Sequence, residues 1–420
     1  MDPSKDISNL ESERMSDILD TIGKFLEKTP IPNKTELLKR VQDLKGFIFE
    51  GRAPRIMIIG RRGAGKSSLL NAILGEKLAG TGSVLSETGN AKWYSHGSSL
   101  GEIEILDTRG LGDSTRPEAS KFKSSLEDIK EEIRKCCPDA VLFLCKAKEV
   151  DAHIGVDIGQ LSEIRDFIRD KHYYEIPVIA VITQVDELDP VRVSEPPYDD
   201  QWKKDNIGLA VRTVEKALDA KLPGLVRAFP VSALAEYDDE GKRTYERFWN
   251  IDVLSNFLLD VLPKETKMQF ARASRIKGAQ VRIARNMVRS VSIVCAGIAV
   301  EPIPVADMIP ITSLQVAMIT GIAYLSGRKL DKKGAVDFMT AAGLNLGAAY
   351  GLRELARQLV KLIPVAGSVI SPAIAYAGTW AIGNAAISYF IKEEKMENIK
   401  KDMKTSREEA EKEFSKGIEK

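Results

Sequence analysis

Histidine and cysteine are scarce in this chain of 420 residues, which holds three histidines and four cysteines. The histidines lie far apart in sequence, which argues against a histidine-rich metal site. No two cysteines form a CxxC pair, so we expect reduced thiols rather than a disulfide scaffold or a zinc cluster. The cysteines are Cys136, Cys137, Cys145 and Cys295. The charged first residues contain no apolar signal region, and together these features predict a cytoplasmic protein.

An excess of charge of one sign is also missing, because 61 Lys and Arg residues oppose 60 Asp and Glu residues. This balance disfavours a protein that coats nucleic acid, and we expect no nucleic-acid partner. Hydrophobic residues make up 44% of the chain and charged residues 29%, as is ordinary for a globular protein. The length predicts about two or three domains.

Changes in composition and in the spacing of apolar residues divide the chain into four segments. Residues 1–50 carry two stretches with apolar side chains at helical spacing, separated by Thr29-Pro30-Ile31-Pro32, which stops a helix. Residues 51–263 alternate short apolar runs with helical periods. Residues 264–391 are rich in alanine and glycine, and residues 392–420 form a charged helix or tail.

The second segment has the pattern of an α/β domain. The predicted strands cover 56–59, 103–106, 140–145, 178–182 and 228–231. The predicted helices cover 66–77, 117–136, 157–171 and 204–221. Strands that are apolar almost throughout predict a mostly parallel sheet with helices on both faces, and the flanking segments predict an all-α part.

A phosphate-binding motif lies between the first predicted strand and the first predicted helix of this domain. The residues Gly60-Arg61-Arg62-Gly63-Ala64-Gly65-Lys66-Ser67 fit the pattern GxxxxGK[ST] and are followed by Ser68. Glycines allow backbone N–H groups to surround a phosphate, and the helix N-terminus adds its dipole. Lys66 can reach the β- and γ-phosphates, and Ser67 can bind Mg²⁺. The motif predicts a nucleoside triphosphate site.

Three later motifs point to guanine nucleotides, GTP and GDP. In Asp107-Thr108-Arg109-Gly110, Asp107 would hold Mg²⁺ through water and the Gly110 N–H would sense the γ-phosphate. In Thr183-Gln184-Val185-Asp186, a carboxylate at Asp186 can accept both the N1–H and the N2–H₂ of guanine, a donor pair that adenine lacks. In Ser232-Ala233-Leu234, a backbone N–H could meet guanine O6.

Taken together, the four motifs resemble those of the GTPases of the translation-factor-related class, in particular the Era/septin-like branch. The resemblance covers about residues 55–263 and implies GTP hydrolysis with Mg²⁺. The stretch SLLNAILGEKL is similar to the same helix in Era-like proteins. Counting onward from it selects Thr88, among Thr81, Ser83 and Thr88, as the switch threonine that closes over the γ-phosphate and metal.

The chain departs from this family pattern in the groups that act on the attacking water. Gly63 stands where potassium-activated members carry asparagine, and Leu111 stands where Ras-like proteins carry a water-orienting glutamine. We therefore expect slow turnover, with the missing group supplied by another element or subunit. Arg61 and Arg62 are candidates, and each is either an arginine that reaches a phosphate in trans across a dimer or a solvated loop residue. Gln184 replaces the commoner lysine.

The C-terminal half offers two interpretations at each of its notable stretches. Residues 268–290 hold six basic and no acidic side chains, which fits either a basic amphipathic helix on an anionic membrane or the solvated face of a packed helix. Residues 362–391 are free of charge and rich in small residues, which fits a tight bundle or a membrane-inserting hairpin. A Pro-Ile-Pro-x-Ala-Asp segment at 302–307 resembles a helical domain of unknown function found after Era-like GTPases.

The overall layout also resembles immunity-related GTPases and, more loosely, dynamin-like proteins. Our first hypothesis is a self-assembling GTPase, a homodimer or higher oligomer through its GTPase domains, that contacts an anionic membrane through 268–290 and 291–391. In that case the protein would be peripheral to the membrane or inserted in it. The alternative is a soluble GTP-dependent switch whose helical domain binds a protein partner. RNA binding is a weaker third hypothesis, because no GxxG loop lies between short strands after Pro263.

Overall fold

The computed structural model describes residues 3–77, 91–98, 101–107, 125–151, 154–222, 227–300, 309–330, 333–341 and 371–418. The chain forms two compact units. The α/β unit comprises residues 53–279, and the helical unit comprises residues 1–52 together with 280–420. The N-terminal helices therefore belong with the C-terminal ones.

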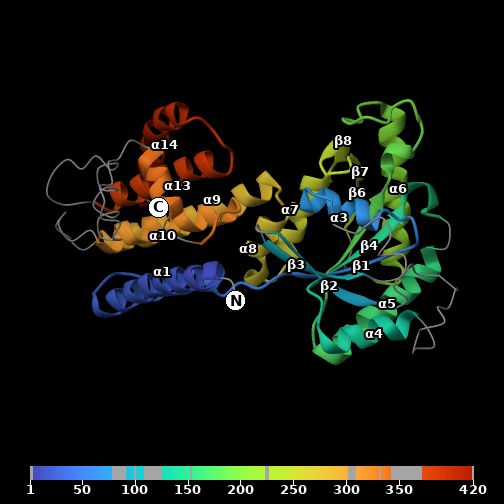
Figure 1. Ribbon diagram of the computed structural model, residues 1–420, viewed down its shortest axis with the longest axis horizontal. Coiled ribbons are helices and arrows are strands. Elements are labelled where there is room, and N and C mark those ends of the chain that lie inside the picture. The colour runs from blue at the N-terminus through green and yellow to red at the C-terminus, as the bar shows by residue number, and fades with distance from the viewer. Residues whose placement is uncertain are drawn as a thin grey trace. The chain divides into compact units, whose positions relative to one another are not determined.

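A six-stranded sheet forms the centre of the α/β unit, with the strand order β2-β3-β1-β4-β5-β6 (Figure 1). Its strands are β1 (Arg55–Gly60), β2 (Lys92–Ser98), β3 (Gly101–Asp107), β4 (Ala140–Lys146), β5 (Val178–Thr183) and β6 (Ala228–Pro230). Edge strand β2 is antiparallel to β3, and every other pairing in this sheet is parallel. The prediction of a mostly parallel sheet is confirmed.

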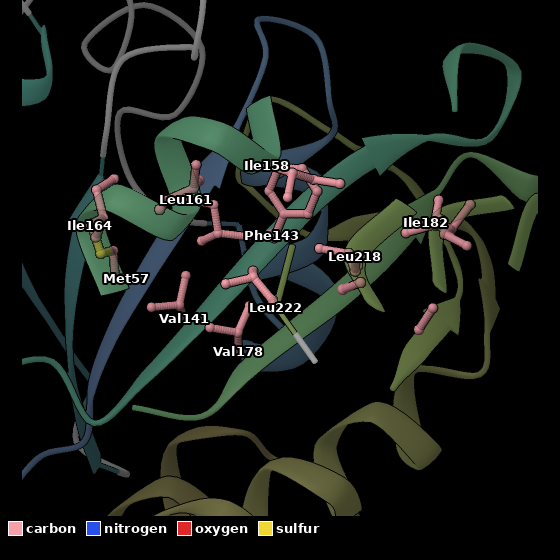
Figure 2. Close-up of a cluster of buried hydrophobic side chains, with 14 of the residues drawn as sticks. Met57, Val141, Phe143, Ile158, Leu161, Ile164, Val178, Ile182, Leu218 and Leu222 are labelled. Atoms are coloured by element: carbon pink, nitrogen blue, oxygen red, sulfur yellow. The ribbon is translucent and has the colours of Figure 1, made fainter. Parts of the chain in front are cut away.

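Helices cover both faces of this sheet, so the central strands β1, β4 and β5 are buried on both sides. The helices are α3 (Lys66–Leu74), α4 (Ser125–Lys135), α5 (Ile154–His172), α6 (Gln201–Asp219), α7 (Ile251–Val261) and α8 (Lys264–Ala273). One face packs Met57 and Phe143 against α5 and α6, as Figure 2 shows for the buried cluster. Ile56 and Ile58 alternate with Met57 along β1 and are also buried, so the opposite face is covered too.

A second, two-stranded sheet follows β6 and was not predicted from the sequence. Strands β7 (Ser232–Tyr237) and β8 (Arg243–Trp249) pair antiparallel, with Ser232 opposite Trp249. Most of their side chains are half-buried or exposed, so the hairpin lacks the continuous apolar run by which the other strands were recognised. It begins at the Ser232-Ala233-Leu234 motif and so extends the predicted base-recognition segment.

The helical unit is built from long helices. They are α1 (Pro3–Lys28), α2 (Lys34–Phe49), α9 (Lys277–Ile298, mostly in this unit), α10 (Ile309–Leu325), α11 (Lys333–Ala341), α13 (Pro372–Phe390) and α14 (Met396–Ile418). Small residues let these helices approach closely. A Cβ added at Gly297 would lie 2.5 Å from Leu37 Cδ1, and one added at Gly383 would lie 2.4 Å from Val288 Cγ2. Within the described ranges, none of the helices is long and apolar enough to cross a membrane.

The basic stretch 268–290 is not one amphipathic helix, which corrects that part of the sequence interpretation. Helix α8 ends at Ala273, and α9 begins at Lys277 after Arg275, whose φ of 48° is incompatible with a continuous helix. Arg272 is buried, and Arg275 pairs with Glu76 at 2.6 Å. Only the α9 part of the stretch presents arginines on an exposed helix face.

Candidate nucleotide-binding site

The phosphate loop joins the end of β1 to the start of α3. Gly63 and Gly65 have φ values of 78° and 80°, in the left-handed region that favours glycine. A Cβ at Gly60 would lie 2.8 Å from the Leu144 carbonyl oxygen, so β1 and β4 approach there in a way that only glycine permits. These glycines give the loop the tight curvature that a phosphate cradle requires.

Lys66 and the two serines occupy the first turn of α3. The Lys66 Nζ donates to the carbonyl oxygens of Gly60 at 3.1 Å and Arg61 at 3.3 Å, so the ammonium group lies over the loop. Ser67 is half-buried and Ser68 is exposed. Lysine, serines and glycine backbone thus converge at the N-terminus of one helix, where an anion is favoured.

The two loop arginines have different surroundings. Arg61 makes a two-point ion pair with Asp157 of α5, with Nε–Oδ2 at 2.8 Å and Nη2–Oδ1 at 2.9 Å. The hydrogen bond with Asp157 raises the pKa of the Arg61 guanidinium above its ordinary value. Arg62 is exposed to solvent. Asp157 carries no motif and was missed by the sequence analysis.

The end of β5 is hydrogen-bonded directly to the phosphate loop. The Thr183 hydroxyl is 2.9 Å from the carbonyl oxygen of Ala64 and 3.2 Å from that of Cys145. Gln184 has a φ of 59°, and its Nε2 donates to the Gly63 carbonyl oxygen at 2.9 Å. Two motifs that are about 120 residues apart in sequence therefore form one continuous site.

A buried lysine supports the segment that carries Asp186. The Lys203 Nζ, from α6, donates to the carbonyl oxygens of Asp186 at 2.8 Å and Leu188 at 2.5 Å, and it lies over the Tyr198 ring. Burial lowers the pKa of the Lys203 ammonium, although the nearby Asp186 carboxylate opposes this change. Nothing in the local sequence distinguished Lys203 from a solvated helical lysine.

The hairpin lies beside this segment. The Ser232 hydroxyl donates to the Arg247 carbonyl oxygen at 2.6 Å, and the Val231 N–H donates to the Ile182 carbonyl oxygen at 2.8 Å. Ser232 and Ala233 are buried, whereas Leu234 is exposed. The Arg247 guanidinium in turn lies near the Asp186 carboxylate, with Nη1–Oδ2 at 3.6 Å. The ends of β5 and β6 and the hairpin thus form one wall of the site.

Other predicted site residues lie outside the described part of the chain. Thr88 and Gly110 belong to this group, as do Arg109 and Leu111. Asp107 ends β3, next to β1 in the sheet, but its side chain is not among those described. Within the described ranges, no three His, Cys, Asp or Glu side chains gather as a metal-binding group.

Two segments of the chain match known protein families. Residues 55–184 match the family described as "50S ribosome-binding GTPase", and residues 265–416 match a domain of unknown function, DUF697. The chain is 30% identical over 141 residues to the probable GTP-binding protein EngB of Streptococcus mutans, covering 32% of this chain and 63% of EngB. It is also 30% identical over 89 residues to translocase of chloroplast 159 of Arabidopsis thaliana, covering 21% of this chain and 6% of that protein.

A solved structure of Era, in complex with MgGDPNP and part of 16S ribosomal RNA, is also similar. It shares 22% identity, covers 58% of this chain and 68% of Era, and has a TM-score of 0.32. The chain spans less than two thirds of the length of either curated relative described above. By the family matches, residues 55–184 of the α/β unit are a domain of the P-loop GTPase family, and the domain of unknown function follows at residues 265–416.

Proposed function

We propose that this protein binds GTP with Mg²⁺ and hydrolyses it to GDP and phosphate. The observation that carries the proposal is the pair of hydrogen bonds from Thr183 and Gln184 to the phosphate loop, at 2.9 Å each. They join the segment suited to guanine to the segment suited to phosphate. A nucleotide bound there would meet both at once.

The phosphate loop would hold the nucleotide by its backbone N–H groups, from Gly60 to Ser68, and by the Lys66 ammonium. Ser67, Thr88 and Asp107 are the residues proposed to hold Mg²⁺, and Gly110 to sense the γ-phosphate. The metal would neutralise charge on the β- and γ-phosphates. Ser67 fits this role because it lies in the first turn of α3, directly after Lys66.

The guanine base would lie between Gln184 and the Ser232-Ala233-Leu234 segment. Asp186 would accept the two donors of the base, and a backbone N–H of the 232–234 segment would meet O6. The Thr183 hydroxyl is already donated to backbone carbonyl oxygens, so its role would be to hold the loop rather than to touch the base.

Turnover would be slow in an isolated molecule and faster on self-assembly. No glutamine follows the Asp-Thr-Arg-Gly motif, since that position is Leu111. An arginine supplied in trans can accelerate GTP hydrolysis by about 10³–10⁵-fold. Arg62 suits that role better than Arg61, because Arg62 is exposed while Asp157 holds the Arg61 guanidinium at two points.

Nucleotide affinity and turnover test this proposal directly. We expect GDP and GTP to bind with at least about hundredfold preference over ADP and ATP, and Lys66→Ala to abolish turnover. GTP turnover per molecule should rise with protein concentration in the wild type. Arg62→Ala should remove that rise without changing GDP affinity. Equal affinity for adenine nucleotides would refute the guanine assignment, and a flat concentration profile would refute the assembly step.

We also propose that α9 brings the protein to an anionic membrane. Arg282, Arg285 and Arg289 are exposed along one side of α9, and no acidic residue lies between 268 and 290. Ile283 and Val288, on the other side, are buried within the unit. The contact would therefore be electrostatic, worth about 1 kcal/mol per arginine, rather than insertion of an apolar face.

Co-sedimentation with phosphatidylserine vesicles tests the membrane contact. Changing Arg282, Arg285 and Arg289 to glutamate should abolish binding, and raising the salt concentration should weaken it in the wild type. The matched control makes the same change to glutamate at Lys400, Lys401 and Lys404, which are exposed on the mixed-charge helix α14. This control should keep its binding to the vesicles. If the wild type does not sediment in low salt, the membrane role is wrong. A nucleotide-dependent protein partner captured without lipid would then favour the soluble-switch alternative.

A further inference from the structure

Asp186 has a cationic neighbour that lies outside every sequence motif. Arg247, on β8, places Nη1 at 3.6 Å from Asp186 Oδ2. The Asp186 side chain is 9% exposed and the Arg247 side chain 18% exposed, so the pair is screened little by water. The negative charge of the nearly buried Asp186 carboxylate is therefore offset by the Arg247 guanidinium, which lies on one side of it.

The position of Arg247 is itself fixed by several contacts. Its Nη2 donates to Glu195 Oε1 at 2.6 Å and to the Tyr245 hydroxyl at 2.8 Å, and its Nε donates to Glu195 Oε1 at 3.1 Å. The Tyr245 hydroxyl also donates to Glu195. In addition, the Arg247 backbone carbonyl accepts from Ser232. A guanidinium held at this many points cannot follow the carboxylate if the carboxylate rotates.

The backbone of Asp186 has a separate support. Lys203 donates to the Asp186 carbonyl oxygen from α6, whereas Arg247 contacts the carboxylate from the hairpin. The position of the main chain and the rotation of the side chain are thus controlled by two different cations. Substituting one of them should leave the contact made by the other in place.

We propose that Arg247 is a specificity-determining positioning residue, which fixes the rotation of the Asp186 carboxylate so that both oxygens face the donors of guanine. This inference rests on the proposed function, because it assigns Asp186 to the base. Guanine presents N1–H and N2–H₂ side by side, and both carboxylate oxygens must lie near the base plane to accept them. Hypoxanthine lacks the N2 amino group and presents N1–H alone. A freely rotating Asp186 carboxylate can still accept a hydrogen bond from a single donor. Guanine, but not hypoxanthine, therefore loses a hydrogen bond when the rotation is no longer fixed.

The ratio of affinities for GDP and IDP measures this effect. Arg247→Met keeps an apolar stem and removes the charge. We expect it to weaken GDP binding by about tenfold and IDP binding by less than about threefold, as the loss of one hydrogen bond to a charged acceptor predicts. Arg243→Met is the matched control, since Arg243 lies on the same strand and pairs with Glu246 instead. It should leave the ratio unchanged.

If Arg247 had a merely structural role, Arg247→Met would weaken the binding of GDP and of IDP by the same factor. That result would overturn the inference. If Arg247→Met does not fold, Glu195→Gln provides the second variant, because Glu195 is 59% exposed and holds Arg247 from the outer side. We expect Glu195→Gln to lower the GDP-to-IDP ratio by a smaller factor in the same direction. An unchanged ratio in the folded variant would equally contradict the inference.

Asp186→Asn separates this inference from the proposed function on which it rests. An asparagine amide can donate to the C2 carbonyl of xanthine, so the variant should prefer XDP to GDP if Asp186 reads the base. If that preference does not appear, the base assignment is wrong. If it appears, Arg247→Met added to Asp186→Asn should change XDP affinity by less than about threefold, because the charged partner is gone. A change of about tenfold in XDP affinity would mean that Arg247 affects base binding by some means other than the Asp186 carboxylate.

Discussion

Arg61 and Asp157 connect the phosphate loop to α5 by a two-point ion pair, with N–O distances of 2.8 and 2.9 Å. The Asp157 side chain is 9% exposed and the Arg61 side chain 32% exposed. The pair therefore fixes Arg61, the second residue of the phosphate-binding motif, against helix α5. The motif begins at Gly60 and α5 begins at Ile154, 94 positions later in the chain. A loop that is anchored in this way keeps its curvature before any nucleotide binds.

Removing either partner of this pair should have unequal effects on stability. Arg61→Met leaves a nearly buried carboxylate unpaired, and we expect it to lower the free energy of unfolding by about 1–3 kcal/mol, below the full value for a buried pair because Arg61 is partly exposed. Asp157→Asn leaves an arginine that can turn into water and should cost about 1 kcal/mol. Urea unfolding measures both, and Arg62→Met should stay within about 0.5 kcal/mol of wild type. Equal losses at the two positions would contradict this account.

Thr183 should contribute to nucleotide affinity by holding the phosphate loop, independently of any contact with the base. Thr183→Val keeps the shape of the side chain and removes the hydroxyl that donates to Ala64 and Cys145. We expect GDP affinity to fall by about tenfold, since loss of a buried hydrogen bond costs about 1–2 kcal/mol. The control is Thr213→Val, which removes a similar but exposed hydroxyl–carbonyl bond to Leu209 within α6. Calorimetric titration with GDP compares the two, and an equal change in both would exclude a specific role for Thr183.

The sequence predicted those parts of the fold and site that depend on nearby residues. A glycine-rich loop between an apolar strand and a helix is a local pattern, and the structure places Gly63, Gly65 and Lys66 in that arrangement. The five parallel strands were recognisable because each carries a short apolar run, as buried strands of a parallel sheet do. Strand β2 and the β7–β8 hairpin were missed because most of their side chains are half-buried or exposed, so these strands lack a continuous apolar run.

The partners of the site residues were missed for a different reason. Asp157, Lys203 and Arg247 gain their roles only from contacts with residues far away in the chain. Lys203 and Arg247 each lie beside other charged residues, where a solvated side chain is the ordinary expectation, and Asp157 belongs to no motif that marks it. A single sequence does not encode which of its charged residues will be buried beside a carbonyl or a carboxylate.

Cys145 should react with alkylating agents only slowly in the folded protein. Burial raises the pKa of its thiol to about 12, and the nearby Asp157 carboxylate adds to this effect. An unfolded thiol has a pKa of about 8.5 and is largely thiolate at pH 9.5. We expect the native alkylation rate at pH 9.5 to be about a hundredfold or more below the rate in urea. The native rate should keep rising up to about pH 12, whereas the unfolded rate should level off above about pH 9.

Mass spectrometry of iodoacetamide-treated protein measures the modification of Cys145 separately from the other cysteines. Asp157→Asn removes one of the groups that disfavour the thiolate, so the native rate at pH 9.5 should increase. A native rate that levels off near pH 9 would mean that the thiol is accessible to water and ionises normally.

The helical unit contains a buried polar pair whose removal should be strongly non-additive. Gln315 Nε2 donates to Thr379 Oγ1 at 2.9 Å, and both residues are fully buried. The Gln315 Oε1 has no hydrogen-bond partner among the described residues. Thr379→Val removes the acceptor and leaves the buried amide unpaired, which should lower stability by about 1–3 kcal/mol. Thr21→Val, which removes an exposed hydroxyl on α1, should change stability by less than about 0.5 kcal/mol.

Combining Thr379→Val with Gln315→Leu should restore stability to the wild-type level or above, because the double variant removes the buried amide together with its hydrogen-bond partner. Thermal unfolding of the four proteins in this cycle gives the coupling energy, and we expect it to exceed about 1 kcal/mol. Additive losses would mean that each side chain is held by packing rather than by the other. If the double variant proves more stable than wild type, the pair lowers the stability of the α10–α13 contact. Hydrogen exchange should then show slower opening of these two helices in the double variant than in the wild type.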